Sequence, residues 1–416
     1  MADLFIIKDT LANKITFWHL LLLMASLPFD MFYSHIILIS LILHTLIQFH
    51  KPARPVLSLR TLALASVFLV TAFSTIYSVN RAAAYNEWGK QVMILLFPVL
   101  FCFLPPDLKK YRASLLAGFA VVCTATVVYL YLDAFFTLRY YGLPLSSLFS
   151  YAFTNHNFSA PIEIHATFFS MQLALALVFL LSVLIESPRF RYNLFFTGCI
   201  LVLAAGLIQL SSKSVCFCLL LLINLAVPYF LLGKPAGRKY ILVTASLSIL
   251  AVVFIFKMGT FRERFISQLH HDLSVASPAG FGDSRLARWE LVGQLIAKAP
   301  VTGYGAGSEL PLLRNIFFEK KLYSSYLHRL NAHNQYLSLL LKSGIPGLLI
   351  YLATLLFGIV TALKKRDLLF FVFILLVAIV SLSENLLDVN KGIIFYAFFF
   401  SFFVFSAEGN NKLITD

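Results

Sequence analysis

Twelve apolar runs alternate with shorter polar segments along the chain. Their centres lie near residues 22, 40, 68, 97, 122, 172, 200, 221, 247, 346, 375 and 399. An α-helix needs about 20 apolar residues to cross the hydrocarbon core of a bilayer. The pattern therefore predicts an all-α, polytopic membrane protein with about twelve transmembrane helices.

Two of the connections between these runs are longer than the others. Residues 134–160 are expected to form a loop of medium length, and residues 258–331 a much larger one. A connection as long as the second is uncommon and favours a functional element with its own structure. The sequence thus predicts three parts: residues 1–257 with nine spans, the large loop 258–331, and residues 332–416 with three spans.

Composition narrows the class of protein further. Hydrophobic residues make up 60% of the chain and charged residues only 12%, whereas soluble domains average about half and about a quarter. These values exclude a soluble enzyme, a disordered chain and a nucleic-acid-binding domain. The net charge of +14 could suggest a nucleic-acid partner, but the basic residues fall between the apolar runs. We expect membrane lipids as neighbours and no nucleic acid.

The basic residues also predict how the chain is oriented. Alternate short loops carry fourteen lysines and arginines, while the short loops between them carry five. Because positive charge marks the cytoplasmic side of a membrane protein, both termini are expected in the cytoplasm. The large loop is then expected on the outer side.

The large loop itself is basic, with nine lysines and arginines against six acidic residues. A positive excess on the outer face suggests an anionic ligand held there. A solvated cap tied together by salt bridges is the alternative that charge alone leaves open.

Residues 284–300 of the loop have apolar positions at helical spacing and predict an amphipathic helix. Asp283 or Ser284 can cap its start, and Pro300 follows its end. Arg285 lies in the first turn, where a cation gains nothing from the helix dipole. This position favours a role of Arg285 towards a ligand, with an ordinary surface arginine as the alternative.

Two further features follow in the loop. Residues 303–308 superficially match a dinucleotide-binding loop, but no strand precedes them, so we interpret them as a tight turn that lets the backbone approach a neighbour. His333 lies beside Asn334 where the chain re-enters the membrane, and a histidine there can accept a proton near neutral pH. Pro346 and its neighbouring glycines are expected to kink the span that follows.

Polar residues at the outer ends of other spans are additional candidates. Lys213 lies in a very short hairpin, where it either extends to lipid phosphate or faces the same anion as Arg285. His165, Glu384 and Asp388 are ionisable residues at membrane depth, where burial is costly and function is the default hypothesis. A carboxylate there could instead pair with Lys391 or Lys213.

Three stretches together carry a resemblance to a known family. They read Ser284-Arg285-x-x-x-Trp289, Pro300-x-x-Gly303-x-Gly305-x-Gly307, and His333-Asn334-x-x-Leu337 followed by Gly344 and Gly347. In order and topology they resemble the O-antigen ligase and polymerase superfamily. The motifs cover about residues 280–350, and the twelve-span layout extends the similarity over most of the chain.

The resemblance implies a GT-C-like fold in the bacterial inner membrane, with short amphipathic helices of the periplasmic loop above an outer cavity. It implies a membrane glycosyltransferase that takes a glycan from an undecaprenyl-diphosphate carrier. An O-antigen ligase passes the glycan to a lipid A-core acceptor, and a polymerase passes it to another carrier-linked repeat. We expect a ligase acting by inverting transfer without a metal or other cofactor.

The polymerase is the first alternative, because both enzymes use the same donor. A transporter or flippase of a lipid-linked anion is an alternative from another class. Against it, the sequence shows no convincing internal repeat, and its long loop lies on one side only.

The resemblance also suggests roles for individual residues. His333 matches the family's essential histidine and Arg285 an arginine of the large loop, so both are expected to be catalytic. Lys213 stands where the family usually has an arginine, which keeps the charge but loses the bidentate fork. The residues expected to bind substrate are Lys213, Arg288, Tyr304, Asn334, Arg81, His165, Glu384 and Asp388.

Overall fold

A computed structural model describes residues 7–48, 56–104, 108–187, 192–274 and 283–407, and all regular elements in these ranges are helical. The first half of the chain contains α1 (Leu11–Ser26), α2 (Met31–Ile47), α3 (Leu59–Ser74), α4 (Arg81–Phe103), α5 (Lys109–Tyr140), η2 (Leu145–Phe149), α6 (His156–Ser159), α7 (Ala166–Glu186) and α8 (Asn193–Leu210). The middle contains α9 (Lys213–Leu221), η5 (Leu222–Ala226), α10 (Val227–Leu231), α11 (Lys234–Lys257), α12 (Gly259–Arg262), η6 (Glu263–Ser267) and α13 (Gln268–Asp272). The last part contains α14 (Arg285–Lys298), α15 (Glu309–Glu319), α16 (Tyr323–Leu327), α17 (Gln335–Lys365), α18 (Leu368–Val380), η7 (Leu386–Asp388) and α19 (Asn390–Ser406).

Each of the twelve apolar runs coincides with helical structure. Within the described ranges, six helical segments are long and apolar enough to cross a membrane: Lys109–Tyr140, Ala166–Glu186, Asn193–Leu210, Lys213–Leu231, Pro235–Val253 and Gln335–Lys365. The helices α2, α3, α18 and α19 are apolar but shorter. Twelve spans therefore remain a prediction. The expected basic loops around residues 51–54 and 189–191 lie outside the described residues.

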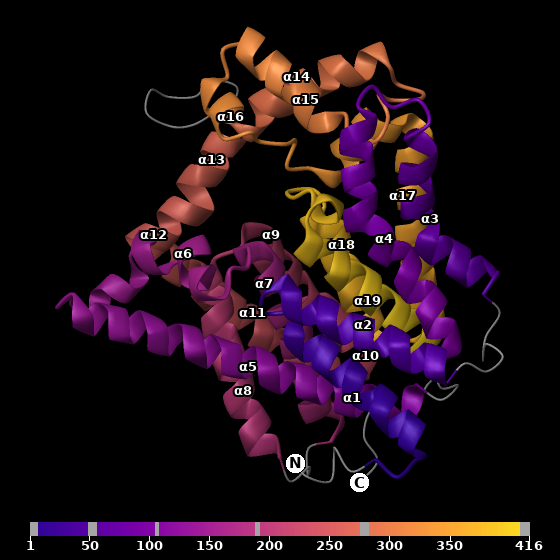
Figure 1. Cartoon of the computed structure of the whole chain (residues 1–416). Helices are drawn as coiled ribbons and strands as arrows, with labels where there is room; N and C mark the ends of the chain where they lie inside the picture. Colours follow the sequence, from indigo (N-terminus) through magenta and orange to yellow (C-terminus); the bar gives the residue numbers. More distant parts are fainter. Residues whose placement is uncertain (1–6, 49–55, 105–107, 188–191, 275–282, 408–416) are drawn as a thin grey trace.

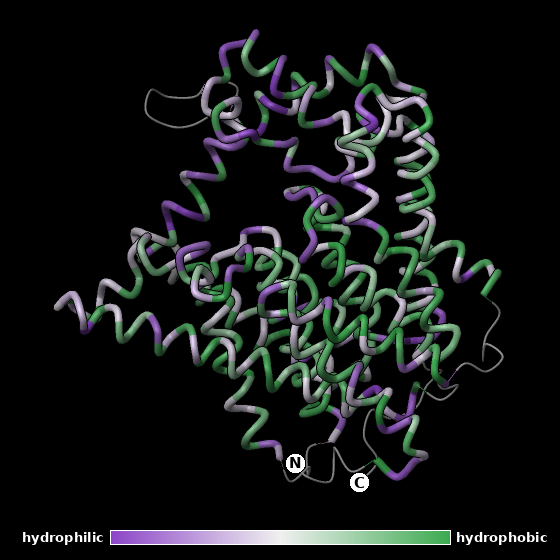
Figure 2. Tube along the Cα trace, viewed as in Figure 1, coloured by the Kyte–Doolittle hydropathy of each residue, from purple (hydrophilic) through white to green (hydrophobic). Residues whose placement is uncertain are grey.

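Helices α14, α15 and α16 of the large loop form a separate layer at one end of the molecule. Figure 1 shows α14, α15 and α16 together there, while α1 and the end of α19 lie towards the opposite end. Hydrophilic residues concentrate along α13 and in this layer, and the helices beneath are mostly hydrophobic (Figure 2). This arrangement is the one expected if α14 to α16 cover the polar end of a helical membrane bundle.

The centre of the bundle is built from helices that are apolar on all sides. Nearly every side chain of α7 and α19 is buried, as expected for helices without a polar face. Phenylalanines from α18 and α19 fill the space between these two helices, and Phe373 lies against Phe395, Phe399 and Phe403. By contrast, α11 exposes most of its apolar side chains, as a helix facing lipid would.

The expected loop at residues 134–160 is only partly a loop. Helix α5 continues to Tyr140, so residues 134–140 are helical. At 1.5 Å per residue its 32 residues span roughly 48 Å, well beyond the roughly 30 Å hydrocarbon core. The apolar-run pattern missed this extension because the final turns contain polar residues such as Asp133 and Arg139.

The expected kink in the span at residue 346 is present. Gly344 has φ +63° inside α17, and Pro346 follows it. The kink leaves the carbonyls of Leu341 and Lys342 without their usual helical partners, because Ile345 N–H donates to the Pro300 carbonyl instead and Pro346 has no N–H. The glycine turn, residues 303–308, supplies N–H donors to these carbonyls instead. Tyr304 N–H donates to the Leu341 carbonyl at 2.9 Å, and Gly305 N–H donates to the Lys342 carbonyl at 2.8 Å. Residues 303–308 thus form the close-approach turn that the sequence predicts.

Replacing Gly305 with alanine is expected to destabilise this turn. Gly305 has φ +85°, and a Cβ there would lie 2.2 Å from Ser78 Cα. The backbone strain and the clash together should cost at least about 2 kcal/mol. Gly293 is the matched control, since it lies in α14 with nothing within 4 Å of an added Cβ. In thermal unfolding of the purified protein, we expect Tm to fall in Gly305→Ala and to stay or rise in Gly293→Ala. Equal Tm values would contradict this account.

Candidate active site

A cavity of about 340 Å³ with several charged side chains in its wall lies between the large loop and the helices of the bundle. Its walls come from the start of α7, the α8–α9 turn, the η6–α13 helix, α14 and the segment after α18 (Figure 1). The lining residues are Thr167, Ser212, Lys213, Ser214, Phe217, Arg264, Leu269, Asp272, Leu273, Arg285, Trp289, Ile379, Leu382, Ser383 and Glu384. The cavity therefore collects side chains from parts of the chain more than two hundred residues apart.

Lys213 and Arg285 both approach this cavity from the first residue of a helix. Ser212 precedes Lys213 at the start of α9, and Ser284 caps α14 by accepting a hydrogen bond from Ala287 N–H. A cation at a helix N-terminus is disfavoured by the helix dipole. Two such cations facing one space make that space attractive to an anion.

The two cations converge on the carboxylate of Asp272. Lys213 Nζ lies 3.0 Å and Arg285 Nε 3.7 Å from the same oxygen, Oδ2. Arg285 also donates from Nη1 to the Ser383 carbonyl at 2.6 Å. Lys213 thus faces the same anionic group as Arg285. Of the two environments predicted for Lys213, contact with lipid phosphate or with the anion that Arg285 faces, this is the second. The Asp272 carboxylate therefore occupies the position that the positive charges of Lys213 and Arg285 both face.

Arg264 is a third cation of the cavity and was not among the predicted site residues. Its Nε donates to the Ser211 carbonyl at 3.4 Å, and its Nη1 to Gln268 Oε1 at 2.9 Å. Burial lowers the pKa of Arg264, but an arginine remains charged at neutral pH. In the sequence, Arg264 is one of nine basic residues of the loop, with no motif to distinguish it.

The ionisable side chains that line the cavity carry a net positive charge. Lys213, Arg264 and Arg285 are opposed by the carboxylates of Asp272 and Glu384. Arg285 Nη2 lies 3.9 Å from Glu384 Oε1, so the two carboxylates hold the arginine from both sides. An entering diphosphate would meet three fixed cations and would compete with Asp272 for two of them.

His333 and Glu384 form a pair at the edge of the cavity. His333 Nδ1 lies 3.2 Å from Glu384 Oε2, and about a quarter of the His333 side chain is exposed. Burial raises the pKa of Glu384, but the hydrogen bond from His333 and the nearby charges outweigh it and bring the pKa to about 2. Glu384 is therefore ionised at neutral pH. When Nδ1 donates to this carboxylate, Nε2 is the acceptor nitrogen of the neutral ring.

The backbone at His333 is held in an unusual conformation by its neighbours. His333 has φ +47°, a region that costs free energy for a residue with a side chain. Asn331 Oδ1 accepts from His333 N–H at 2.9 Å. From α14, Arg288 Nη1 donates to the Asn331 carbonyl at 3.2 Å, and Trp289 Nε1 to the Ala332 carbonyl at 2.8 Å. Arg288, predicted to bind substrate, is buried against this loop and does not line the cavity.

His165 lies next to the cavity wall. It caps the start of α7, where its Nδ1 accepts from Thr167 N–H at 3.4 Å. Its ring centroid lies 4.1 Å from that of His156. Burial lowers the pKa of His165, and burial together with His165 brings the pKa of His156 to about 4. Both rings are therefore neutral at pH 7 and suit hydrogen bonding better than charge pairing.

Three other predicted residues are placed in the framework. Tyr304 OH donates to the Leu295 carbonyl at 3.0 Å, and Asn334 caps α17 by accepting from Tyr336 N–H. Arg81 starts α4, donates to a carbonyl five residues earlier and does not line the cavity. Their substrate-binding roles remain predictions.

The two acidic candidates after α18 have different partners. Glu384 faces the cavity and pairs with His333 and Arg285, whereas Asp388 Oδ1 lies 2.7 Å from Lys342 Nζ. The alternative pairing with Lys213 or Lys391 is wrong for both carboxylates, because no such ion pair exists among the described residues. Their different partners separate two residues that the sequence could not distinguish.

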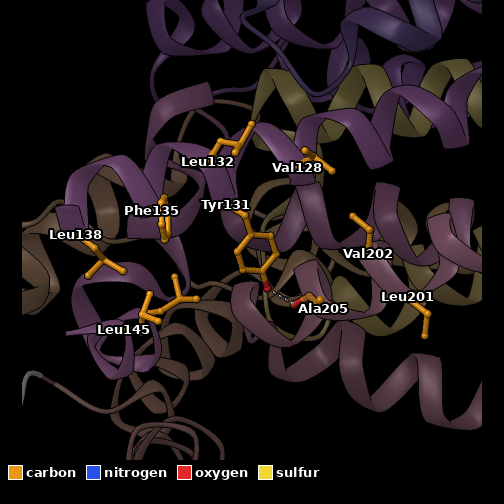
Figure 3. A pocket seen from close by; sticks show the side chains of 10 residues that line it. Val128, Tyr131, Leu132, Phe135, Leu138, Leu145, Leu201, Val202 and Ala205 are labelled. Carbon is orange, nitrogen blue, oxygen red and sulfur yellow. Dashed lines mark hydrogen bonds between the residues drawn. The ribbon is translucent and has the colours of Figure 1, made fainter. Parts of the chain in front are cut away.

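A larger cavity, of about 510 Å³, lies between α5, η2 and α8 and is apolar (Figure 3). Its one polar side chain belongs to Tyr131, whose hydroxyl donates to the Ala205 carbonyl at 2.9 Å. With no ionisable acid or base apart from this phenol, the apolar cavity cannot supply acid–base chemistry. The cavity with three cations in its wall and the His333–Glu384 pair at its edge is the candidate active site. Among the described residues, no cluster of His, Cys, Asp and Glu side chains is arranged to hold a metal ion.

Comparison with known proteins supports the resemblance that the sequence motifs suggest. The family model described as O-antigen ligase matches residues 169–352, a stretch that contains Lys213, Arg285 and His333. The long apolar helices and this match together indicate a multi-pass membrane enzyme that handles lipid-linked glycans. The match supports the resemblance of the chain to the O-antigen ligase and polymerase superfamily. No curated protein gives a significant match to the chain.

Proposed function

We propose that the protein is an O-antigen ligase. It transfers a glycan from undecaprenyl diphosphate to lipid A-core at the periplasmic face of the inner membrane, by inverting transfer without a metal. The observation that carries the proposal is the convergence of Lys213 and Arg285 on one point, next to the His333–Glu384 pair. This arrangement offers fixed cations for a diphosphate and a base for an acceptor hydroxyl.

The chemistry of the transfer assigns a role to each group. The acceptor oxygen attacks the anomeric carbon while the bond from that carbon to the diphosphate oxygen breaks. The bonding electron pair leaves with the diphosphate, where Arg285, Lys213 and Arg264 stabilise the developing negative charge. The proton of the acceptor hydroxyl passes to His333 Nε2, and ionised Glu384 stabilises the resulting imidazolium. Direct displacement inverts the anomeric centre.

The apolar cavity between α5 and α8 supports a lipid-linked donor. Its lining contains no charged side chain and includes Leu201, Val202 and Ala205 of α8. The same helix continues from Ala205 to the turn that holds Ser212, roughly 10 Å further along its axis. We assign this cavity to the polyprenyl chain of the carrier, with the diphosphate at the turn.

The glycan profile of a deletion strain tests the proposed function. The bacterium that carries the gene is compared with its deletion strain and with strains complemented by wild type or His333→Ala. Lipid A-core and carrier-linked glycans are separated and quantified. We expect long glycan to remain on the carrier and to disappear from lipid A-core in the deletion strain. Wild type should restore attachment, and an equally expressed His333→Ala variant should not.

Two outcomes would overturn the assignment as a ligase. Attachment of single repeats in the deletion strain would show that chain elongation fails and that the protein is a polymerase. An unchanged glycan profile with loss of another exported compound would favour transport.

A further inference from the structure

A buried carboxylate lies behind the candidate active site. Glu309 is the first residue of α15 and only 3% exposed. Its oxygens accept hydrogen bonds from Ala332 N–H at 2.9 Å and from Asn385 Nδ2 at 3.0 Å, and it also accepts from the Ser338 hydroxyl. Lys342 Nζ lies 4.0 Å away. Glu309 thus fills its acceptor capacity with donors from three different segments.

Two of these donors adjoin the two members of the catalytic pair. Ala332 directly precedes His333, and Asn385 directly follows Glu384. The same carboxylate therefore holds the chain on both sides of the 3.2 Å contact between His333 and Glu384. These two segments are about fifty residues apart in the chain, so their separation depends on tertiary contacts.

Asn385 also connects the segment around Glu384 directly to the segment around His333. Its Oδ1 accepts from Asn334 N–H at 2.8 Å, on the other side of His333. Its Nδ2 also donates to Asp388 at 2.9 Å, and Asp388 pairs with Lys342. The backbone of His333, strained at φ +47°, is thereby fixed at the residue before it and at the residue after it.

We propose that Glu309 is the positioning residue of the His333–Glu384 pair. Glu309 does not touch the reacting atoms. It fixes the positions of Ala332 and Asn385, so that the His333 imidazole and the Glu384 carboxylate keep their hydrogen-bonding distance and orientation. This inference rests on the proposed function, because Glu309 is assigned to set the geometry of the same active site. A misplacement of about 1 Å in such a pair is enough to lower a rate by about 100-fold.

The Glu309→Gln variant tests the proposal in purified protein with a lipid-linked donor. A glutamine keeps the size of the side chain, but its NH₂ group would face the hydrogen-bond donors that the carboxylate oxygen faces. The NH₂ group cannot accept a hydrogen bond from Asn385 or Ser338. We expect kcat to fall about 10- to 100-fold, with KM for the donor changed by less than about threefold. In a His333→Ala background, the same substitution should cause no further loss, because Glu309 acts through His333.

Asp367→Asn is the control for a neutralised buried carboxylate. Asp367 is 8% exposed and pairs with Arg112 at 2.6 Å, in a pair outside the cavity lining. This variant should lose thermal stability and keep its kcat. Asn385→Ala removes the side chain that joins Glu309 to the segment around Glu384. If Glu309→Gln does not fold, Asn385→Ala is the replacement test and is expected to show the same loss of kcat.

The possible failures are distinguishable. If the wild-type protein transfers no glycan, the proposed function fails. If wild type is active and Glu309→Gln behaves like Asp367→Asn, the positioning role is refuted. An equal fold-loss from Glu309→Gln with and without His333 would refute it as well.

Discussion

His333→Ala is expected to lower kcat for glycan transfer about 10²- to 10⁴-fold, the usual contribution of a positioned general base. The physical reason is that Nε2 takes the proton of the acceptor hydroxyl while Nδ1 is held by Glu384 at 3.2 Å. His333→Gln should be nearly as inactive, since an amide can contact Glu384 but cannot accept the proton. The rates are measured with purified protein and a lipid-linked donor.

His328 provides the control for this experiment. It is an exposed histidine of the same loop, and its backbone N–H donates to the Ser324 carbonyl. His328→Ala should transfer glycan at close to the wild-type rate. Activity retained by His333→Ala would contradict the role of His333 as a base.

Arg285→Ala is the second substitution with a large expected effect. Removing one fixed donor to developing negative charge typically costs about 10²- to 10³-fold in kcat. Here the loss also leaves Asp272 and Glu384 without their shared cation, so the cavity becomes less attractive to a diphosphate. Arg285→Lys should fall between wild type and alanine, because an ammonium cannot reach both carboxylates and the Ser383 carbonyl at once.

Arg262 is the matched control, as an exposed arginine of the same loop. Arg262→Ala should leave kcat unchanged in the same assay. A rise in KM with unchanged kcat in Arg285→Ala would mean that Arg285 contributes equally to the ground and transition states. That result would contradict the stabilisation of the leaving group by Arg285.

Helical periodicity and caps made much of the fold predictable. The apolar runs coincide with helices, and α14 starts at Arg285 after Ser284, one of the two predicted caps. The extension of α5 was not predictable from hydropathy, because polar residues near its end resemble a loop. The glycine turn was predictable as a close approach, but its partner, the kinked part of α17, was not.

The candidate site was predictable where a residue had an unusual position. In the sequence, Arg285 stands out at a helix start, against the helix dipole, Lys213 in a very short hairpin, and His333 in a recognisable motif. Arg264 and Glu309 had no such signal. Arg264 is one of nine basic residues of the loop and Glu309 one of six acidic residues. Only the packing of η6 and α15 shows that Arg264 and Glu309 reach the site, because tertiary contacts and not local sequence pattern select them.

Reconstituted transfer by the purified protein tests the central claim most directly. The protein is placed in lipid nanodiscs with undecaprenyl-diphosphate-linked glycan, lipid A-core and a metal chelator, and the released carrier is quantified. We predict that wild type joins the glycan to lipid A-core with an inverted anomeric centre. One undecaprenyl diphosphate should be released for each glycan transferred, and Arg285→Ala should release almost none. Transfer that depends on an added divalent cation, or proceeds equally in Arg285→Ala, would contradict the account.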